Sequence, residues 1–135
     1  MIDDDLTELA LAHALLLDEH PDWSFRGSPH LAPLLPLLRA PASHPRLLLL
    51  DVHMPGQMGV DVLRQLRACA PTSLHVVMLA SHDDARDRRA ARQAGADGFH
   101  LKPVDPGAYR HLLYTLIRQV TDPNGTSSRL DSATS

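Results

Sequence analysis

Three aspartates and one lysine are the side chains of this sequence that could carry out chemistry together. Asp3 and Asp4 stand at the amino end, Asp51 follows a run of four leucines, and Lys102 follows a second short apolar run. Carboxylates that are held close together repel one another, and a divalent cation that prefers oxygen ligands, most naturally Mg²⁺, would relieve that repulsion. With the metal and Lys102 to neutralise a phosphoryl group, Asp51 could attack phosphorus and form an aspartyl phosphate.

Lys102 stands out because it is the one lysine among 13 basic residues, the others all being arginine. In so arginine-rich a chain an ordinary surface cation would most often be arginine. A single lysine therefore suggests a position that needs a compact ammonium rather than a planar guanidinium. We single out Lys102 as a functional residue.

Periodicity predicts the elements that must position these residues. Three apolar runs of strand length predict buried strands: 47–50, 74–80 and 98–101. Segments with helical spacing predict helices: 6–17, 32–39, 59–70, 83–94 and from 106 to about 120. Residues 23–26 could form a further short strand. In the first helix the apolar face is predicted to consist of Leu6, Leu9, Ala10, Leu16 and Leu17.

Apolar strands that alternate with helices indicate an α/β protein with a parallel sheet covered on both faces. In such sheets the functional residues gather where the strands end and the helices begin. Asp51, residues 80–82 and Lys102 all fall at such ends, and the acid pair at 3–4 directly precedes the first helix.

Composition sets further bounds. A chain of 135 residues with 44% hydrophobic residues and a net charge of −3 is typical of one folded domain, and its mild acidity argues against nucleic acid as the main partner. Its apolar runs are too short for a membrane span. The single cysteine, Cys69, cannot form an internal disulfide and suits a reducing compartment. We expect a cytoplasmic protein that contacts neither membrane nor nucleic acid.

Four segments together resemble the receiver domain of response regulators in two-component signalling. They are Ile2 to Asp5, Leu48 to Gly56, Gln93 to Phe99 and Leu101 to Pro103. The resemblance implies a flavodoxin-like (CheY-like) sheet of five parallel strands over residues 1–120, with helices on both faces and a first strand that is short or missing. The polar segment 121–135 is predicted to be a disordered tail.

Carried over by position, the resemblance implies a role for each site residue. Asp51 would be the phosphoacceptor, Asp3 and Asp4 would hold Mg²⁺ together with Asp51 and the backbone carbonyl of His53, and Lys102 would pair with the phosphoryl group. Phe99 matches the aromatic switch position, whose rotamer reports activation in the family.

The resemblance also implies partners. A histidine kinase or a histidine phosphotransfer protein would supply the phosphoryl group, and the domain would catalyse its own phosphotransfer and dephosphorylation without being a turnover enzyme. A stand-alone receiver would signal to a protein target through the surface of residues 83–120, as a monomer or weak homodimer.

Two features depart from the family pattern. Ala80 occupies the position of a threonine or serine whose hydroxyl would bond the phosphoryl group, and the neighbouring Ser81 is one residue off and should point to the opposite face. We therefore expect phosphorylation to remain possible and its coupling to the output surface to weaken. In addition only Met1 and Ile2 precede the acid pair, which suggests a translation start further upstream or a stub strand that costs stability.

Two alternatives stay open. The departures leave open a degenerate receiver that binds its partner independently of phosphorylation, as the alternative to a phosphoacceptor. A phosphohydrolase is disfavoured, because His53 stands where such enzymes place a second aspartate. His53 and His82 could also face the acid pocket, where they would bind a transition metal or tune the access of water, although with nine histidines in the chain a chance placement is the preferred interpretation.

Overall fold

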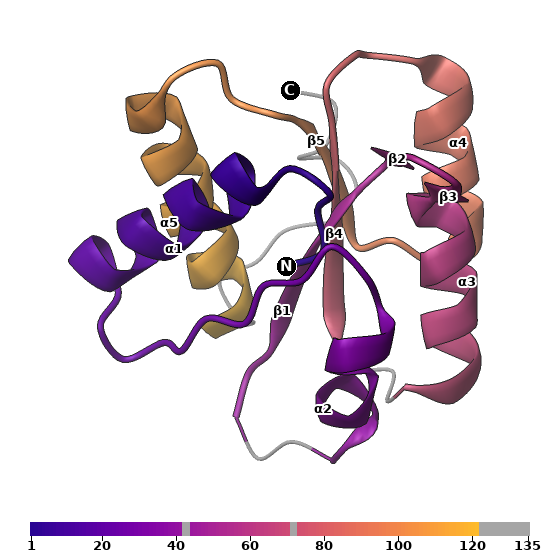
Figure 1. The fold of residues 1–135 in the computed structure, drawn as a ribbon, viewed down its shortest axis with the longest axis horizontal. Coiled ribbons are helices and arrows are strands. Elements are labelled where there is room, and N and C mark those ends of the chain that lie inside the picture. Colours follow the sequence, from indigo (N-terminus) through magenta and orange to yellow (C-terminus); the bar gives the residue numbers. More distant parts are fainter. Residues whose placement is uncertain (42–43, 71–72, 122–135) are drawn as a thin grey trace.

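A parallel sheet of apolar strands lies at the centre of the molecule (Figure 1). The computed structural model describes residues 1–41, 44–70 and 73–121. Its laddered strands are β1 (Leu47–Asp51), β4 (His75–Ala80) and β5 (Gly98–Leu101), in the order β1-β4-β5. The three strands predicted from the apolar runs are thereby confirmed.

The amino end continues the sheet beyond β1. Ile2, which is fully buried, forms single parallel bridges to Leu50 on one side and to Ser28 on the other. Its N–H donates to the Leu49 carbonyl (2.9 Å), and its own carbonyl accepts from the Asp51 N–H (3.0 Å). The first strand is therefore short, as predicted. The two positions of the sheet beyond β1, at Ile2 and then at Ser28, are each reduced to a single bridge.

The strand predicted at 23–26 is wrong. The chain pairs with the sheet at Ser28 instead, between Gly27 and Pro29. Glycine weakens a strand and proline has no N–H to donate to a ladder, so the pairing does not extend from this point.

Helices cover both faces of the sheet (Figure 1). The helices α1 (Leu6–Glu19) and α5 (Pro106–Thr121) pack on one face. The other face carries η1 (Ala32–Leu34), α2 (Leu35–Arg39), α3 (Gly59–Cys69) and α4 (Ala85–Ala94). Alternate residues of β1 enter opposite cores, with Leu48 and Leu50 towards α3 and Leu49 towards α5, as the pleat of a strand requires.

The face predicted for the first helix is partly wrong. Leu6 and Leu17 are 68% and 60% exposed, and the buried side chains of α1 are Leu9, Ala12, Leu15 and Leu16. Because leucine and alanine surround this helix on nearly every side, the sequence pattern does not single out one face.

Capping residues set the ends of the later helices. The Asp84 carboxylate accepts from the Arg86 N–H (2.8 Å), so α4 begins at Ala85 rather than at the predicted residue 83. The same helix ends at Gly95, whose φ of +98° is left-handed. Asp105 caps α5 by accepting from the Ala108 N–H (2.8 Å), as the Asp-Pro pair predicts.

A short hairpin between β1 and α3 was not predicted. Its strands are β2 (His53–Met54) and β3 (Gln57–Met58), which pair antiparallel, and Gly56 turns the chain with a φ of +73°. The hairpin fixes the backbone that immediately follows Asp51.

Arg67 ties together the ends of four elements. Its guanidinium donates to the carbonyls of Leu74 (2.8 Å) and Gly95 (2.9 Å) and to the Asp97 carboxylate (2.9 Å). Asp97 also accepts from the Val76 N–H (2.9 Å). The pair thus joins α3, the start of β4, the end of α4 and the start of β5.

We expect Arg67→Ala to lower the free energy of unfolding by about 2–3 kcal/mol, because the carbonyls of Leu74 and Gly95 and the Asp97 carboxylate lose the guanidinium that bonds all three. Urea unfolding followed by circular dichroism measures this change. Arg64→Ala is the matched control, since Arg64 is exposed and pairs with the exposed Asp61 of the same helix (3.0 Å). Equal losses in the two variants would contradict the bridging role of Arg67.

Candidate functional site

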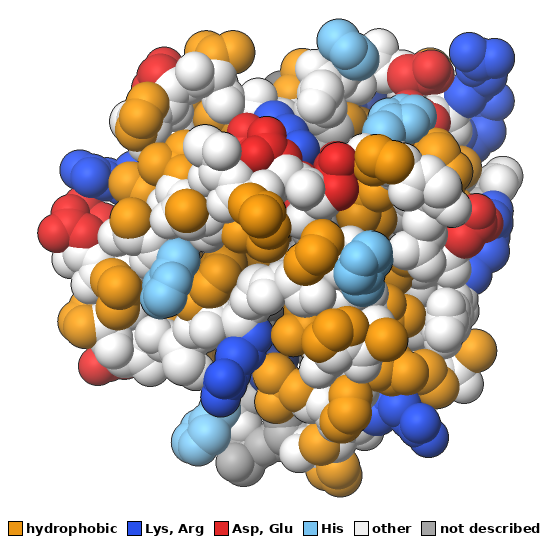
Figure 2. All heavy atoms as spheres, viewed as in Figure 1, with side chains coloured by type: hydrophobic (Ala, Val, Ile, Leu, Met, Phe, Trp, Pro, Cys, Tyr) orange, Lys and Arg blue, Asp and Glu red, His pale blue; other side chains and the backbone are white. Residues whose placement is uncertain are grey.

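Three carboxylates gather at the carboxyl edge of the sheet. Asp3, Asp4 and Asp51 each offer an oxygen, and these oxygens lie within 4.8 Å of one another. Asp3 is fully buried, Asp51 is 5% exposed and Asp4 is exposed. Figure 2 shows acidic side chains beside a basic one at this edge, in the upper part of the view.

Backbone hydrogen bonds hold the site residues in place. Asp51 is the last residue of β1, and the N–H of the next residue, Val52, donates to the Leu79 carbonyl (2.9 Å). The Asp3 N–H donates to the Ser28 carbonyl (3.2 Å), and the Lys102 N–H donates to the Ala80 carbonyl (2.7 Å). The sheet therefore brings residues from three separate parts of the chain to one point.

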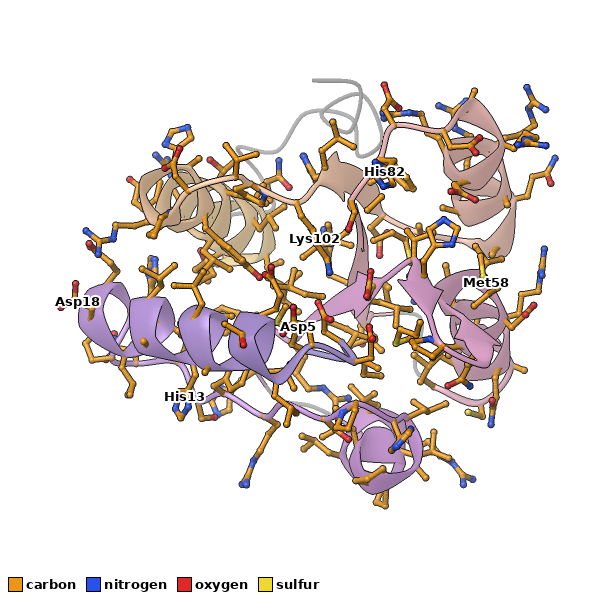
Figure 3. All side chains as sticks on the ribbon, turned by 45° about the horizontal axis from the view of Figure 1, so that its top comes forward. Asp5, His13, Asp18, Met58, His82 and Lys102 are labelled. Atoms are coloured by element: carbon orange, nitrogen blue, oxygen red, sulfur yellow. The ribbon has the colours of Figure 1, made fainter. Side chains whose placement is uncertain are left out.

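Lys102 bridges two of the carboxylates. Its Nζ lies 2.9 Å from Asp3 Oδ2 and 3.4 Å from Asp51 Oδ2. Figure 3 places Lys102 between Asp5, at the start of α1, and His82, after β4. Burial lowers the pKa of Lys102, but the hydrogen bond and negative charge of Asp3 and the charge of Asp51 outweigh it, so the net pKa is raised and the ammonium stays charged.

For the Asp51 carboxyl, the effects that favour the neutral form outweigh the effect of Lys102. Burial and then the negative charge of Asp3 raise its pKa from 3.8 to about 6, against the lowering effect of Lys102. Without a bound cation, the ionised form of Asp51 is therefore costly in the folded protein.

This pKa predicts how Asp51→Asn changes stability. Because the folded state binds the proton more tightly, stability falls as pH rises from the unfolded pKa through the folded pKa of about 6. The neutral amide escapes this loss. In a chelator we expect Asp51→Asn to be more stable than the parent by about 2 kcal/mol at about pH 8, and by no more than about 0.5 kcal/mol at about pH 4.

Urea unfolding at the two pH values measures this difference. Asp61→Asn serves as the control, since Asp61 is exposed and belongs to α3. If the advantage of Asp51→Asn were the same at both pH values, ionisation of the Asp51 carboxyl would not be its cause.

The two histidines considered for the pocket do not join the acid cluster. Among the residues that the structure describes, the group able to hold a metal ion through side chains consists of the three aspartates and includes neither His53 nor His82. The His53 ring points instead to α4, where its Nε2 lies 2.7 Å from Asp87 Oδ2. Nothing in the sequence indicates this contact, because its partners are 34 residues apart.

The two switch positions lie in the core next to the site. Ala80 and Phe99 are both fully buried in the core on the α3 and α4 side of the sheet. The Arg88 guanidinium of α4 covers the Phe99 ring at 4.8 Å from its centroid. The neighbouring Ser81 is exposed, whereas Ala80 is buried.

The sequence model of a known protein family, the response regulator receiver domain, matches residues 1–114 of this chain. The chain belongs to this family. The transcriptional regulatory protein AruR of Pseudomonas aeruginosa is 29% identical to this receiver over 121 residues, which are 89% of this chain and 49% of that protein. The DNA-binding response regulator MtrA of Mycobacterium tuberculosis is 32% identical over 106 residues, 78% of this chain and 44% of that protein. This receiver chain spans about half the length of these two relatives.

Solved receiver structures share its fold. The CheY-like receiver domain protein from Methanospirillum hungatei superposes with a TM-score of 0.73 at 21% identity, over 91% of this chain and 92% of that one. The response regulator receiver protein from Burkholderia phymatum gives 0.68 at 27% identity, over 96% and 95%. The predicted flavodoxin-like fold is confirmed. No helix in the described part of this receiver is long and apolar enough to cross a membrane.

Proposed function

We propose that this receiver accepts a phosphoryl group on Asp51 in a Mg²⁺-dependent reaction and signals through contact with another protein. The observation that carries the proposal is the position of Lys102, within 2.9 Å of Asp3 and 3.4 Å of Asp51 at the edge of the sheet. We propose a histidine kinase or a histidine phosphotransfer protein as the donor, in keeping with the family.

The donor set fits Mg²⁺. The carboxylates of Asp3, Asp4 and Asp51 are hard oxygen ligands close enough to share one ion, and the backbone carbonyl of His53 would complete the protein ligands. Burial and then the negative charge of Asp3 raise the pKa of Asp51 in spite of Lys102, and a divalent cation bound to these carboxylates would favour the ionised form. Bound there, the ion would supply the charge that neutralises phosphoryl oxygens.

The residues of the chain then have separate tasks. An Asp51 carboxylate oxygen attacks the phosphorus of the phosphohistidine, the new O–P bond forms as the P–N bond breaks, and the imidazole leaves with its electron pair and takes up a proton. Lys102 pairs with the transferring phosphoryl group. Asp3 holds the Lys102 ammonium in place through their 2.9 Å contact.

Acetyl phosphate tests the proposal without the natural donor. Intact-protein mass spectrometry should show one phosphoryl increment in the parent with Mg²⁺, and none in a chelator or in Asp51→Asn. Absence of the increment from folded parent protein, or its persistence in Asp51→Asn, would contradict the proposal.

For the output we propose a protein target on the surface of residues 83–120, with the receiver domain as a monomer or weak homodimer in the cytoplasm and without contact to nucleic acid or membrane. Three large apolar side chains are exposed there: Leu101 (40%), Val104 (97%) and Tyr114 (49%). The domain would occupy residues 1–120; the tail predicted at 121–135 lies, beyond Thr121, outside the described residues. Such a receiver would catalyse only its own phosphotransfer and dephosphorylation.

Ala80 supports a second candidate, a receiver that binds its target independently of phosphorylation. Its methyl group is fully buried and cannot bond a phosphoryl oxygen. Target binding that is unchanged by Mg²⁺, by acetyl phosphate and by Asp51→Asn would favour this candidate over a phosphorylation switch.

A further inference from the structure

The His53 side chain connects the loop after the phosphoacceptor strand to α4. Its backbone is fixed in the β2–β3 hairpin, where His53 pairs with Met58. Its Nε2–H donates to Asp87 in the first turn of α4 over 2.7 Å, and the Asp87 side chain is only 18% exposed. The His53 side chain is 54% exposed, so the strength of the contact comes from its short length and from the largely buried carboxylate at its other end.

The next residue of α4, Arg88, contacts the aromatic switch position on β5. Arg88 lies over the buried Phe99 ring, 4.8 Å from its centroid, and reaches Asp83 at 2.9 Å. Consecutive residues of α4 thus contact the site loop, through Asp87, and the aromatic position on β5, through Arg88. If the loop after Asp51 moved and displaced α4 through Asp87, the Arg88 guanidinium would therefore also move relative to the Phe99 ring.

The contact between His53 and Asp87 is important because this receiver lacks the threonine or serine hydroxyl that its family places at position 80. Ala80 offers a buried methyl group, and Ser81 is exposed. No hydroxyl at position 80 can therefore carry an effect of the Asp51 site to α4, which leaves that role to other contacts. His53 is suited to this, since the residue whose carbonyl would ligate the metal also carries the ring that holds Asp87.

We propose that the hydrogen bond from His53 to Asp87 is the positioning contact through which occupancy of the Asp51 site moves α4. This inference rests on the proposed function of Asp51. Neither residue touches the reacting atoms through its side chain; the pair acts on the helix. Removing the bond should separate the chemistry at Asp51 from the response of α4.

Amide hydrogen exchange of α4 tests this, with beryllofluoride and Mg²⁺ as a mimic of the phosphoryl group. In the parent we expect exchange at residues 85–91 to differ between Mg²⁺ alone and Mg²⁺ with beryllofluoride by roughly fivefold or more. In Asp87→Ala the difference should shrink to less than about twofold. Asp87→Asn keeps an acceptor oxygen and should restore part of it.

Two further variants separate coupling from helix stability. His53→Phe combined with Asp87→Ala should lose no more of the difference than Asp87→Ala alone, as expected for two residues that act through one bond. Asp61→Ala is the matched control, because it removes a first-turn aspartate and its 3.0 Å ion pair from the neighbouring helix α3. It should leave the difference at α4 unchanged.

Fluorine NMR of bound beryllofluoride reports the site itself. If the parent binds none, the proposed function of Asp51 fails. If the parent binds it and α4 responds equally in the parent and in Asp87→Ala, or does not respond in the parent, the proposed function stands and the inference about His53 and Asp87 is overturned.

Discussion

Lys102→Ala is expected to lower the free energy of unfolding by about 3–5 kcal/mol in the absence of Mg²⁺ at a pH above about 7, because it leaves buried carboxylates without their cation. Asp3 is fully buried and Asp51 nearly so, and the Lys102 ammonium lies within 3.4 Å of both. Without it, their repulsion would be relieved only by taking up a proton, which is costly at high pH.

Mg²⁺ should restore much of this loss, because a divalent cation would replace the missing charge. Urea unfolding of the parent and Lys102→Ala, each in chelator and in Mg²⁺, gives the comparison. The stabilisation by Mg²⁺ should be larger in the variant than in the parent. Phosphorylation by acetyl phosphate should still slow by about 100-fold, since Lys102 also pairs with the transferring group.

Two substitutions serve as controls. Lys102→Arg keeps the charge but not the compact ammonium, so we expect it to retain most of the stability and little of the phosphorylation rate. Arg86→Ala removes an exposed cation 3.6 Å from Asp84 and should change neither. If Lys102→Ala were as stable as the parent in chelator, the lysine would not be what stabilises the buried carboxylates.

The core strands could be predicted from the sequence because their signals are local, and so could the position of the aspartates and the lysine at the carboxyl edge of the sheet. Each apolar run between turn residues became a laddered strand, and the span of β5 agrees with the prediction at both ends. The lone lysine among arginines pointed to Lys102, and the structure brings it to two of the predicted aspartates.

The features that could not be predicted are very short strands and contacts between residues far apart in the sequence. Strands of two residues, as in the hairpin of His53 and Met58, are too short to show a period. The bond between His53 and Asp87 joins residues 34 apart, so only the folded sheet brings them together. Ile2 likewise becomes a strand residue only because Leu50 and Ser28 lie on its two sides.

Gly59→Ala is the second substitution for which we expect a large effect, a loss of about 3 kcal/mol or more in the free energy of unfolding. Gly59 is the buried first residue of α3, and its N–H donates to the Val52 carbonyl (2.8 Å). A Cβ at this position would overlap the carbonyl oxygen of Asp51 and lie 3.0 Å from Met78 Cε. Met78 can move, but the Asp51 backbone is held by its bond to Ile2.

The overlap falls on the phosphoacceptor itself, so function should suffer together with stability. Relieving it requires α3 to move away from β1 or Asp51 to move towards the acid cluster, and either displaces the carboxylate from Lys102. Urea unfolding and the mass increment from acetyl phosphate, measured on the same preparation below the unfolding transition, report the two effects.

Gly56→Ala is the matched control for this prediction. Gly56 has a φ of +73°, and apart from its chain neighbours no atom of the described residues lies within 4 Å of a Cβ built on it, so alanine there meets backbone strain but no overlap. We expect it to cost about 1 kcal/mol and to leave phosphorylation intact. If Gly59→Ala costs no more than Gly56→Ala and is phosphorylated as fast as the parent, then α3 does not hold the Asp51 backbone in the way that the structure indicates.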